Sequence, residues 1–317
     1  MLTRSLCFLL ALVTTTAAQA AWPERPVTLV VPFAAGGITD TLARVTAERL
    51  QTAFGKPFVI ENQVGAAGIT ATQRVARAEP DGYTLLFTTI SQIAIAPFTN
   101  KIAYDPIKDF KPVSIIASSP FIVTTGADFP AKTLAQFIDY VRARPGQLTY
   151  GTAGPGSLSH LASALFAKRA GLEMTMVPYR GLAPAFADMV GGNVQMVSAT
   201  PVELKPFLDG GKLQFLGSSG PSRSKVLPDV PAIAETFPGH AATTWNGIVV
   251  PAKVPQEIID ALAREIIAAQ KSPEFSGKLQ QLGVDPVIIT PDDFAKQIAA
   301  DTEIWRKLIP ELGLQAQ

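Results

Sequence analysis

The sequence contains very little cysteine and histidine. Its 317 residues include one cysteine, Cys7, and two histidines, His160 and His240. Cys7 lies in an N-terminal segment that we expect to be removed, so the mature chain should hold no disulfide, thiolate nucleophile or cysteine metal site. Two histidines also leave few ligands for a transition metal. We therefore predict neither a metal site nor a cofactor.

The sequence also lacks a surplus of charge and a long hydrophobic segment. Its 27 basic and 26 acidic side chains nearly cancel, whereas a nucleic-acid-binding surface needs a basic field, so no nucleic-acid partner is expected. The apolar run from Leu6 to Val13 is too short to span a bilayer. A basic residue before it and small residues after it are typical of a signal peptide. We predict a signal peptide over residues 1–20, cleaved near Ala20-Ala21.

What remains is a long chain in which apolar strands alternate with amphipathic helices. Val27 to Val31 is rich in β-branched residues and predicts a strand buried on both faces, and a helix with apolar residues at helical spacing follows it up to Phe54. The order strand, small-residue loop, helix recurs along the chain. About 300 residues exceed what one core usually supports. We therefore predict an α/β fold of two domains, with mostly parallel sheets flanked by helices.

Two chain crossings are expected to form a hinge. We place them near 119–123, where Pro120 divides an apolar segment, and near 244–247, where another apolar strand begins. Domain 1 would then hold residues 21–121 and 246–317, and domain 2 residues 122–245. The helical stripe Ile258, Ile259, Leu262 and Ile266, together with Trp305, is expected to be core.

A turn with almost no side chains, Ala34-Ala35-Gly36-Gly37, connects the first strand to the first helix. Small residues let a ligand approach the backbone closely, and the N–H groups at a helix N-terminus suit an anion. Thr39 is the expected cap of that helix. The turn is therefore either a ligand cradle or an ordinary strand-to-helix connection.

A series of short motifs runs in a fixed order through essentially the whole mature chain. They are Pro32–Asp40 with Ala43-Arg44, Glu61-Asn62 with Gly65–Gly68, Pro80–Leu85, Tyr104-Asp105-Pro106 with Asp109-Phe110, Ser157–Ala162, Val177–Gly181 with Ala183-Pro184-Ala185, Gly191-Gly192, Leu227–Pro231 and Trp245-Asn246-Gly247. Together these motifs resemble the Bug family, the periplasmic receptors of tripartite tricarboxylate transporters.

The resemblance implies a two-domain periplasmic binding protein of the Venus-flytrap, type II-like kind, without enzymatic activity. Such a receptor closes on a small organic acid and hands it to membrane transporter subunits. Family members hold the carboxylate mainly through main-chain N–H groups, hydroxyl side chains and water. A di- or tricarboxylate, an aromatic acid and an amino acid all stay open as ligands, because the sequence departs from the family pattern at Pro155 and over 91–97. We expect a monomer located in the periplasm.

The same resemblance places ligand-binding residues on loops of both domains. In the first domain they are Ala35, Gly36, Gly37, Thr39, Asp40, Gly65, Ala66, Ala67, Thr88, Thr89, Ser91 and Gln92. In the second they are Gly154, Ser157, Ser159, His160, Tyr179, Arg180, Gly181 and Thr200. Asp40 would either support the helix dipole or meet water or a ligand amine. Arg180 would either bond a second carboxylate or bridge the domains.

Two enzymatic alternatives are weaker. A secreted serine hydrolase acting on small esters could use Ser157 or Ser159 with His160, but this segment lacks the second glycine of G-x-S-x-G, and Ser157 is better interpreted as a helix N-cap. A dinucleotide-binding enzyme would need G-x-G-x-x-G, which Ala34 to Gly37 does not match. His240 is expected in a surface loop.

Overall fold

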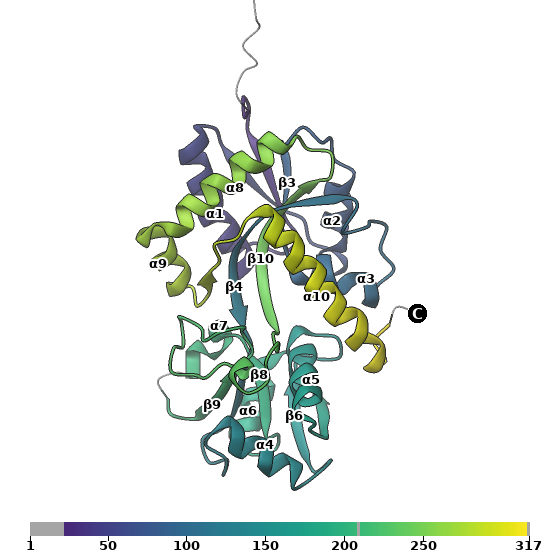
Figure 1. The fold of residues 1–317 in the computed structure, drawn as a ribbon, viewed down its shortest axis with the longest axis vertical. Helices are drawn as coiled ribbons and strands as arrows, with labels where there is room; N and C mark the ends of the chain where they lie inside the picture. The colour runs from purple at the N-terminus through teal and green to yellow at the C-terminus, as the bar shows by residue number, and fades with distance from the viewer. Residues whose placement is uncertain (1–21, 208–209, 316–317) are drawn as a thin grey trace, which may run out of the picture.

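The computed structural model describes residues 22–207 and 210–315. The predicted signal peptide, including Cys7, lies outside these residues. The chain forms two lobes, each built around one β-sheet, and the strands β4 (Phe110–Pro120) and β10 (Thr243–Pro251) run from one lobe toward the other (Figure 1). Within the described residues, no helix is both long enough and apolar enough to cross a membrane.

The first sheet has six strands in the order β11-β4-β10-β3-β1-β2. Besides β4 and β10 they are β1 (Val27–Val31), β2 (Phe58–Asn62), β3 (Thr84–Thr89) and β11 (Asp285–Pro286). β1 pairs in parallel with β2 and β3, whereas β10 is antiparallel to both β3 and β4. The strand predicted over 27–31 is confirmed, and the return strand expected to begin near 244–247 begins at Thr243.

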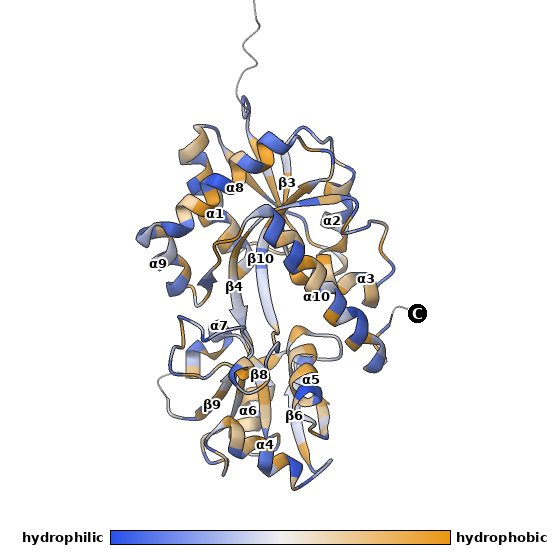
Figure 2. Ribbon diagram, in the orientation of Figure 1, coloured by the Kyte–Doolittle hydropathy of each residue, from blue (hydrophilic) through white to orange (hydrophobic). Residues whose placement is uncertain are grey.

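Helices cover both faces of the first sheet. They are α1 (Ile38–Phe54), α8 (Gln256–Lys271) and α9 (Pro273–Gln281) on one face, and α2 (Ile69–Ala76), α3 (Ala96–Thr99) and α10 (Pro291–Glu311) on the other. In β1, Leu29 faces the first group and Val30 the second, because successive side chains of a strand point to opposite faces. Figure 2 shows the helices of this lobe alternating between polar and apolar residues along their length. The stripe of α8 and Trp305 are buried, as predicted.

The second sheet has five strands in the order β7-β6-β8-β5-β9. They are β5 (Ile122–Gly126), β6 (Leu148–Thr152), β7 (Met174–Pro178), β8 (Met196–Ala199) and β9 (Leu213–Ser218). The helices α4 (Leu134–Arg142) and α5 (Leu158–Ala170) pack against one face, and α6 (Leu182–Val190) against the other. The short helix α7 (Pro201–Leu204) follows β8 at the edge that faces the first lobe.

Both sheets are mixed, which corrects the expectation of mostly parallel sheets. In the second sheet β6 is parallel to β7 and β8, but β5 is antiparallel to β8 and β9. The antiparallel strands include those that carry the chain between lobes. A chain that leaves a lobe on one strand and returns on its neighbour must run in opposite directions, and the repeated strand–helix units do not reveal this.

Ser219 joins the two crossings. Its backbone N–H donates to the Phe121 carbonyl at 2.8 Å, and its own carbonyl accepts from Ala242 N–H at 2.8 Å. Its hydroxyl accepts from Phe121 N–H at 3.0 Å and lies 2.6 Å from the Ala242 carbonyl. Because Phe121 lies between β4 and β5 and Ala242 directly precedes β10, these bonds hold the outgoing and returning chain together.

A buried carboxylate connects β10 to α10. Asp301 accepts hydrogen bonds from Trp245 Nε1 at 2.8 Å and Gln297 Nε2 at 2.9 Å, and it is 6% exposed. Burial raises the pKa of Asp301 to about 6, although these two hydrogen bonds act in the opposite direction. The carboxylate therefore binds a proton more tightly in the folded chain than in the unfolded one.

Asp301→Asn should become more stable relative to the native protein as pH rises from about 4 to about 6. The raised pKa means that the native protein loses stability across this window, by up to ~3 kcal/mol for about two pKa units. His240, whose pKa is lowered to about 4, acts in the opposite direction in both proteins, so the difference between them is the quantity to measure by urea denaturation. A difference that stays flat with pH would contradict this assignment.

Candidate functional site

A cavity of about 350 Å³ lies between the two lobes. Residues of both lobes and of the crossings line it: Phe33, Ile38, Thr39, Thr89, Ser91, Ser119, Phe121, Ala153, Ser157, Leu158, Ser159, Leu182, Thr200, Val202, Glu203, Thr244, Asn246 and Val284. Because the walls belong to different lobes, a change in the angle between the lobes would change the shape of this cavity.

Polar groups of the crossing strands line this cavity without partners of their own. Thr244 lies opposite Ser119 in the pairing of β10 with β4, and Asn246 lies opposite Thr89 in the pairing with β3. Ser119 Oγ and Asn246 Oδ1 are buried and have no hydrogen-bond partner among the described residues. Buried polar atoms in proteins nearly always find a partner. These two atoms therefore point to a ligand or ordered water in the cavity.

Three helices of eight or more residues begin beside the cavity. Ile38 and Thr39 open α1, Ser157 and Leu158 open α5, and Leu182 opens α6. Neither α1 nor α6 has a side-chain cap, which leaves their first-turn N–H groups without an internal acceptor. The positive ends of these helix dipoles therefore face the same space and favour a negatively charged ligand.

Charged side chains contribute little to this cavity. Among the residues that the structure describes, no lysine or arginine lines it, and Glu203 is the one acidic residue that does. The Glu203 carboxylate accepts from the Thr200 N–H and the Thr200 hydroxyl, both at 2.8 Å, as part of the capping box of α7. An anion in the cavity would thus be held by N–H and hydroxyl groups rather than by an ion pair.

Asp40 holds the turn Ala34–Gly37 in place. Its carboxylate accepts from Gly36 N–H, Arg44 Nε and Asn62 Nδ2, each at 2.9 Å, and it is 2% exposed. Burial alone would raise the pKa of Asp40, but the hydrogen bonds from Arg44, Gly36 and Asn62 lower it below its usual value. These contacts favour the structural interpretation of Asp40 over contact with a ligand amine.

Gln92 connects the loop that holds Ala66 and Ala67 to the end of β3. Its Oε1 accepts from Thr89 Oγ1 at 2.8 Å, and its Nε2 donates to the Ala67 carbonyl at 2.8 Å. Ala66 and Ala67 have φ of 45° and 54°, a left-handed conformation that costs energy without glycine. Strain of this kind is common where a loop is shaped for a ligand. Ser91 and Gln92 belong to a π-helical turn, Ser91–Ile95, rather than to the expected loop.

The geometry around Ser157 is that of a helix cap. Ser157 Oγ accepts from the His160 N–H at 3.2 Å and donates to the Gly154 carbonyl at 2.7 Å, which confirms the predicted N-cap of α5. His160 Nδ1 accepts from Gly156 N–H at 3.1 Å, and within the described residues neither Ser157 nor Ser159 bonds its ring. A serine nucleophile needs a base within hydrogen-bond reach, so this arrangement does not support the hydrolase alternative.

The structure brings six of the expected ligand-binding residues into the cavity wall: Thr39, Thr89, Ser91, Ser157, Ser159 and Thr200. The others lie in the surrounding loops or in buried supports, namely Ala35, Gly36, Gly37, Asp40, Gly65, Ala66, Ala67, Thr88, Gln92, Gly154, His160, Tyr179, Arg180 and Gly181. Thr39 is not the cap of α1, because the helix begins at Ile38 with Gly37 as its N-cap. Tyr179 donates to Asp188 at 2.6 Å, whereas the exposed Arg180 has no ion pair in the described chain.

Sequence reasoning missed the part of the cavity formed by the crossing strands. Ser119, Thr244 and Asn246 were expected only as hinge residues, yet they line the cavity. The available signal was Asn246, a polar residue in the otherwise apolar strand Trp245 to Pro251. Across the residues that the structure describes, no group of three or more histidine, cysteine or acidic side chains could hold a metal ion.

Comparison with known proteins identifies close relatives. Residues 42–314 match the model of the tripartite tricarboxylate transporter family receptor. The chain is 35% identical over 298 residues to the UPF0065 protein in the tcbD-tcbE intergenic region of Pseudomonas sp. strain P51, covering 93% of this chain and 89% of that protein. It is 33% identical over 302 residues to BugT of Bordetella pertussis, covering 92% and 90%.

Solved structures agree with this relationship. R. palustris Rpa4515 with adipate is 35% identical with a TM-score of 0.74, covering 93% of this chain and 100% of that one. MatC from Rhodopseudomonas palustris with bound malate is 32% identical with a TM-score of 0.70, covering 91% and 100%. A TctC solute binding protein from Polaromonas with no ligand is 25% identical with a TM-score of 0.84, covering 92% and 99%. The Bug-family resemblance and the binding-protein fold are thereby confirmed.

Asp40→Ala should lower the free energy of unfolding by roughly 1–3 kcal/mol, because it removes the buried acceptor of three hydrogen bonds. Arg44→Ala, which removes only a partner whose side chain is 54% exposed, should lower the free energy of unfolding by clearly less. Chemical denaturation of both variants measures the two values. Equal losses in the free energy of unfolding would show that the carboxylate stabilises the fold only through Arg44 and does not hold the turn Ala34–Gly37.

Proposed function

Since the chain belongs to the tripartite tricarboxylate transporter receptor family, we propose that it captures a small organic carboxylate between its lobes and delivers it to membrane transporter subunits. Membership makes the chain a solute-binding receptor. The ligand proposal rests on the cavity. Ser119 Oγ and Asn246 Oδ1, which have no partner among the described residues, line the same space as the N-termini of α1 and α6, which have no side-chain cap. The proposal includes export to the periplasm, a monomeric receptor and no catalysis.

The ligand we propose carries its charge at the helix N-termini and an apolar body against the remaining walls. Phe33, Phe121 and Leu182 supply apolar surface in the cavity. Relatives solved with adipate and malate support a carboxylate ligand. A tricarboxylate fits less well, because the described part of the cavity wall offers no cation and Glu203 would repel a further negative charge.

We further propose that binding closes the lobes about the crossings. The domains are residues 21–121 with 246–317, and residues 122–245. The Polaromonas structure without ligand superposes better than the adipate- and malate-bound structures, although its sequence identity is lower. This order supports an open arrangement of the lobes here. A ligand that contacts both lobes would stabilise the closed arrangement by its differential affinity.

Gly37→Asp should abolish binding of adipate or malate while the protein stays folded. Gly37 is the N-cap of α1 with φ −75°, and an added Cβ would meet only the Ala34 carbonyl at 3.8 Å, so aspartate fits and is a favourable cap. Its charge would repel the anion. Gly37→Asn has nearly the same shape without the charge and should retain most of the affinity. Calorimetric titration measures both variants, and undiminished binding by Gly37→Asp would show that this loop does not hold the carboxylate.

Saturation with a bound acid should reduce the radius of gyration measured by small-angle X-ray scattering, because closure brings the lobes together. Gly37→Asp mixed with the same acid is the control and should give an unchanged curve. If the native protein binds the acid by calorimetry and its scattering curve does not change, closure about the crossings is wrong while the binding site stands.

A further inference from the structure

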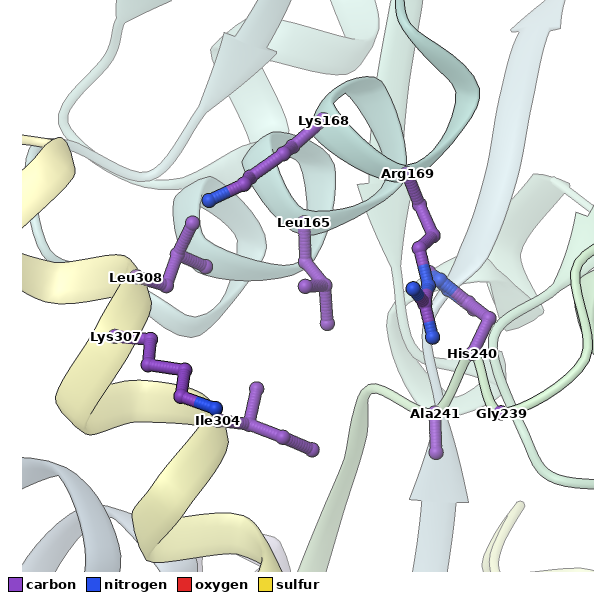
Figure 3. A pocket seen from close by; sticks show the side chains of 9 residues that line it. All are labelled: Leu165, Lys168, Arg169, Gly239, His240, Ala241, Ile304, Lys307 and Leu308. Carbon is purple, nitrogen blue, oxygen red and sulfur yellow. The ribbon is translucent and has the colours of Figure 1, made fainter.

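A second cavity, of about 420 Å³, lies between α5 and α10, which belong to different lobes. We call it the α5–α10 pocket. Figure 3 shows Leu165 and Arg169 of α5 and Ile304 and Lys307 of α10 around a common space. None of the residues that line it lines the cavity described above. It is therefore a separate feature of the molecule.

The charge of this pocket has one sign. Of the described residues, three cationic side chains line it, Lys168, Arg169 and Lys307, and no acidic one does. Lys168 pairs with Glu311 and Lys307 pairs with Glu303 at 2.9 Å, so these two are partly neutralised from outside the pocket. Arg169 forms no ion pair or side-chain hydrogen bond within the described part of the chain. Its guanidinium lies 3.4 Å from the position that a Cβ on Gly239 would take, so it lies over the backbone of the 239–241 segment.

A buried imidazole forms part of the wall. His240 was expected in a surface loop, but it is 2% exposed, which corrects that expectation. Its ring packs edge-on against Phe166, with centroids 6.5 Å apart, and both ring nitrogens lack a partner among the described residues. Burial, and then the charge of Arg169, lower the pKa of His240 to about 4, so the ring is neutral near pH 7. A neutral imidazole has one N–H to donate.

We propose that the α5–α10 pocket binds a small organic anion with an apolar body, of the class of aromatic monocarboxylates. Arg169 and Lys307 hold the carboxylate, and the His240 ring donates to it. The apolar body packs between Leu165, Ile304 and Leu308. An anion here gives the buried His240 ring the hydrogen-bond partner that it lacks, and it gives the exposed Arg169 a charged partner. Because α5 and α10 belong to different lobes, such an anion also contacts both sides of the hinge.

We call the cavity between the lobes, described above, the main cavity. The two histidines allow binding in the α5–α10 pocket to be observed separately from binding in the main cavity. His240 lines the α5–α10 pocket, and His160 lies in the first turn of α5 beside Ser157 and Ser159, which line the main cavity. In protein labelled with ¹³C at histidine, each site has its own ring signal. Titration with benzoate should shift the His240 signal along a saturating curve. Inorganic phosphate, which lacks an apolar body, should bind at least tenfold more weakly.

Arg169→Gln/Lys307→Gln should weaken the benzoate response of His240 at least tenfold. Lys271→Gln/Lys296→Gln removes two exposed cations elsewhere and should leave it unchanged. An unchanged His160 signal verifies that each variant is folded. A His240 shift that does not saturate, or that is equally strong in Arg169→Gln/Lys307→Gln, would overturn the proposal. Benzoate bound in the main cavity would move His160 instead, and Gly37→Asp would remove that response while leaving the His240 curve intact.

Discussion

The pairing of β10 with β4 is the constraint on which the rest of the molecule depends. The register runs from Thr243 opposite Pro120 to Pro251 opposite Phe110, so the two segments that join the lobes form one antiparallel ribbon. Ser219 fastens this ribbon where it enters the second lobe. The same ribbon carries Ser119 and Asn246 into the main cavity. The hinge and the site therefore share residues, and a ligand that supplies partners to these atoms acts directly on the segment about which the lobes would move.

The architecture explains how the proposed anion site can work without a cationic side chain among the described residues. Helices that start at the ends of strands place their N-termini at the edge of each sheet, and where two such edges face each other several dipoles converge. Holding a carboxylate with backbone donors leaves the side chains of the wall free to vary between relatives. Under the proposed function, the apolar wall residues and Glu203 would select which acid fits. The α5–α10 pocket uses the opposite strategy, because its donors are the charged side chains themselves.

Local patterns predicted most of the fold, and long-range pairing accounts for what they missed. The strand Val27–Val31, the helix that ends at Phe54 and the N-cap Ser157 follow from apolar spacing and from the positions of glycine and serine, which are properties of the neighbouring sequence. The mixed sheets, the cavity wall at Asn246 and the burial of His240 depend on segments that are distant in sequence. Asp40 shows the same limit: its three partners identify its role, and two of them, Gly36 and Arg44, lie within four residues, but Asn62 could not be assigned from spacing.

The most direct test of the account is a thermal-shift screen of the mature protein, first freed of any bound ligand, against linear dicarboxylates, aromatic acids, amino acids and citrate. The account predicts that at least one organic acid stabilises the protein by roughly 2.7 kcal/mol at a hundred times its dissociation constant, a shift of several degrees. It also predicts that acids with an apolar body outrank citrate. A protein that no acid stabilises, or that only citrate stabilises, would contradict the assignment of the cavity between the lobes as an apolar-walled carboxylate site.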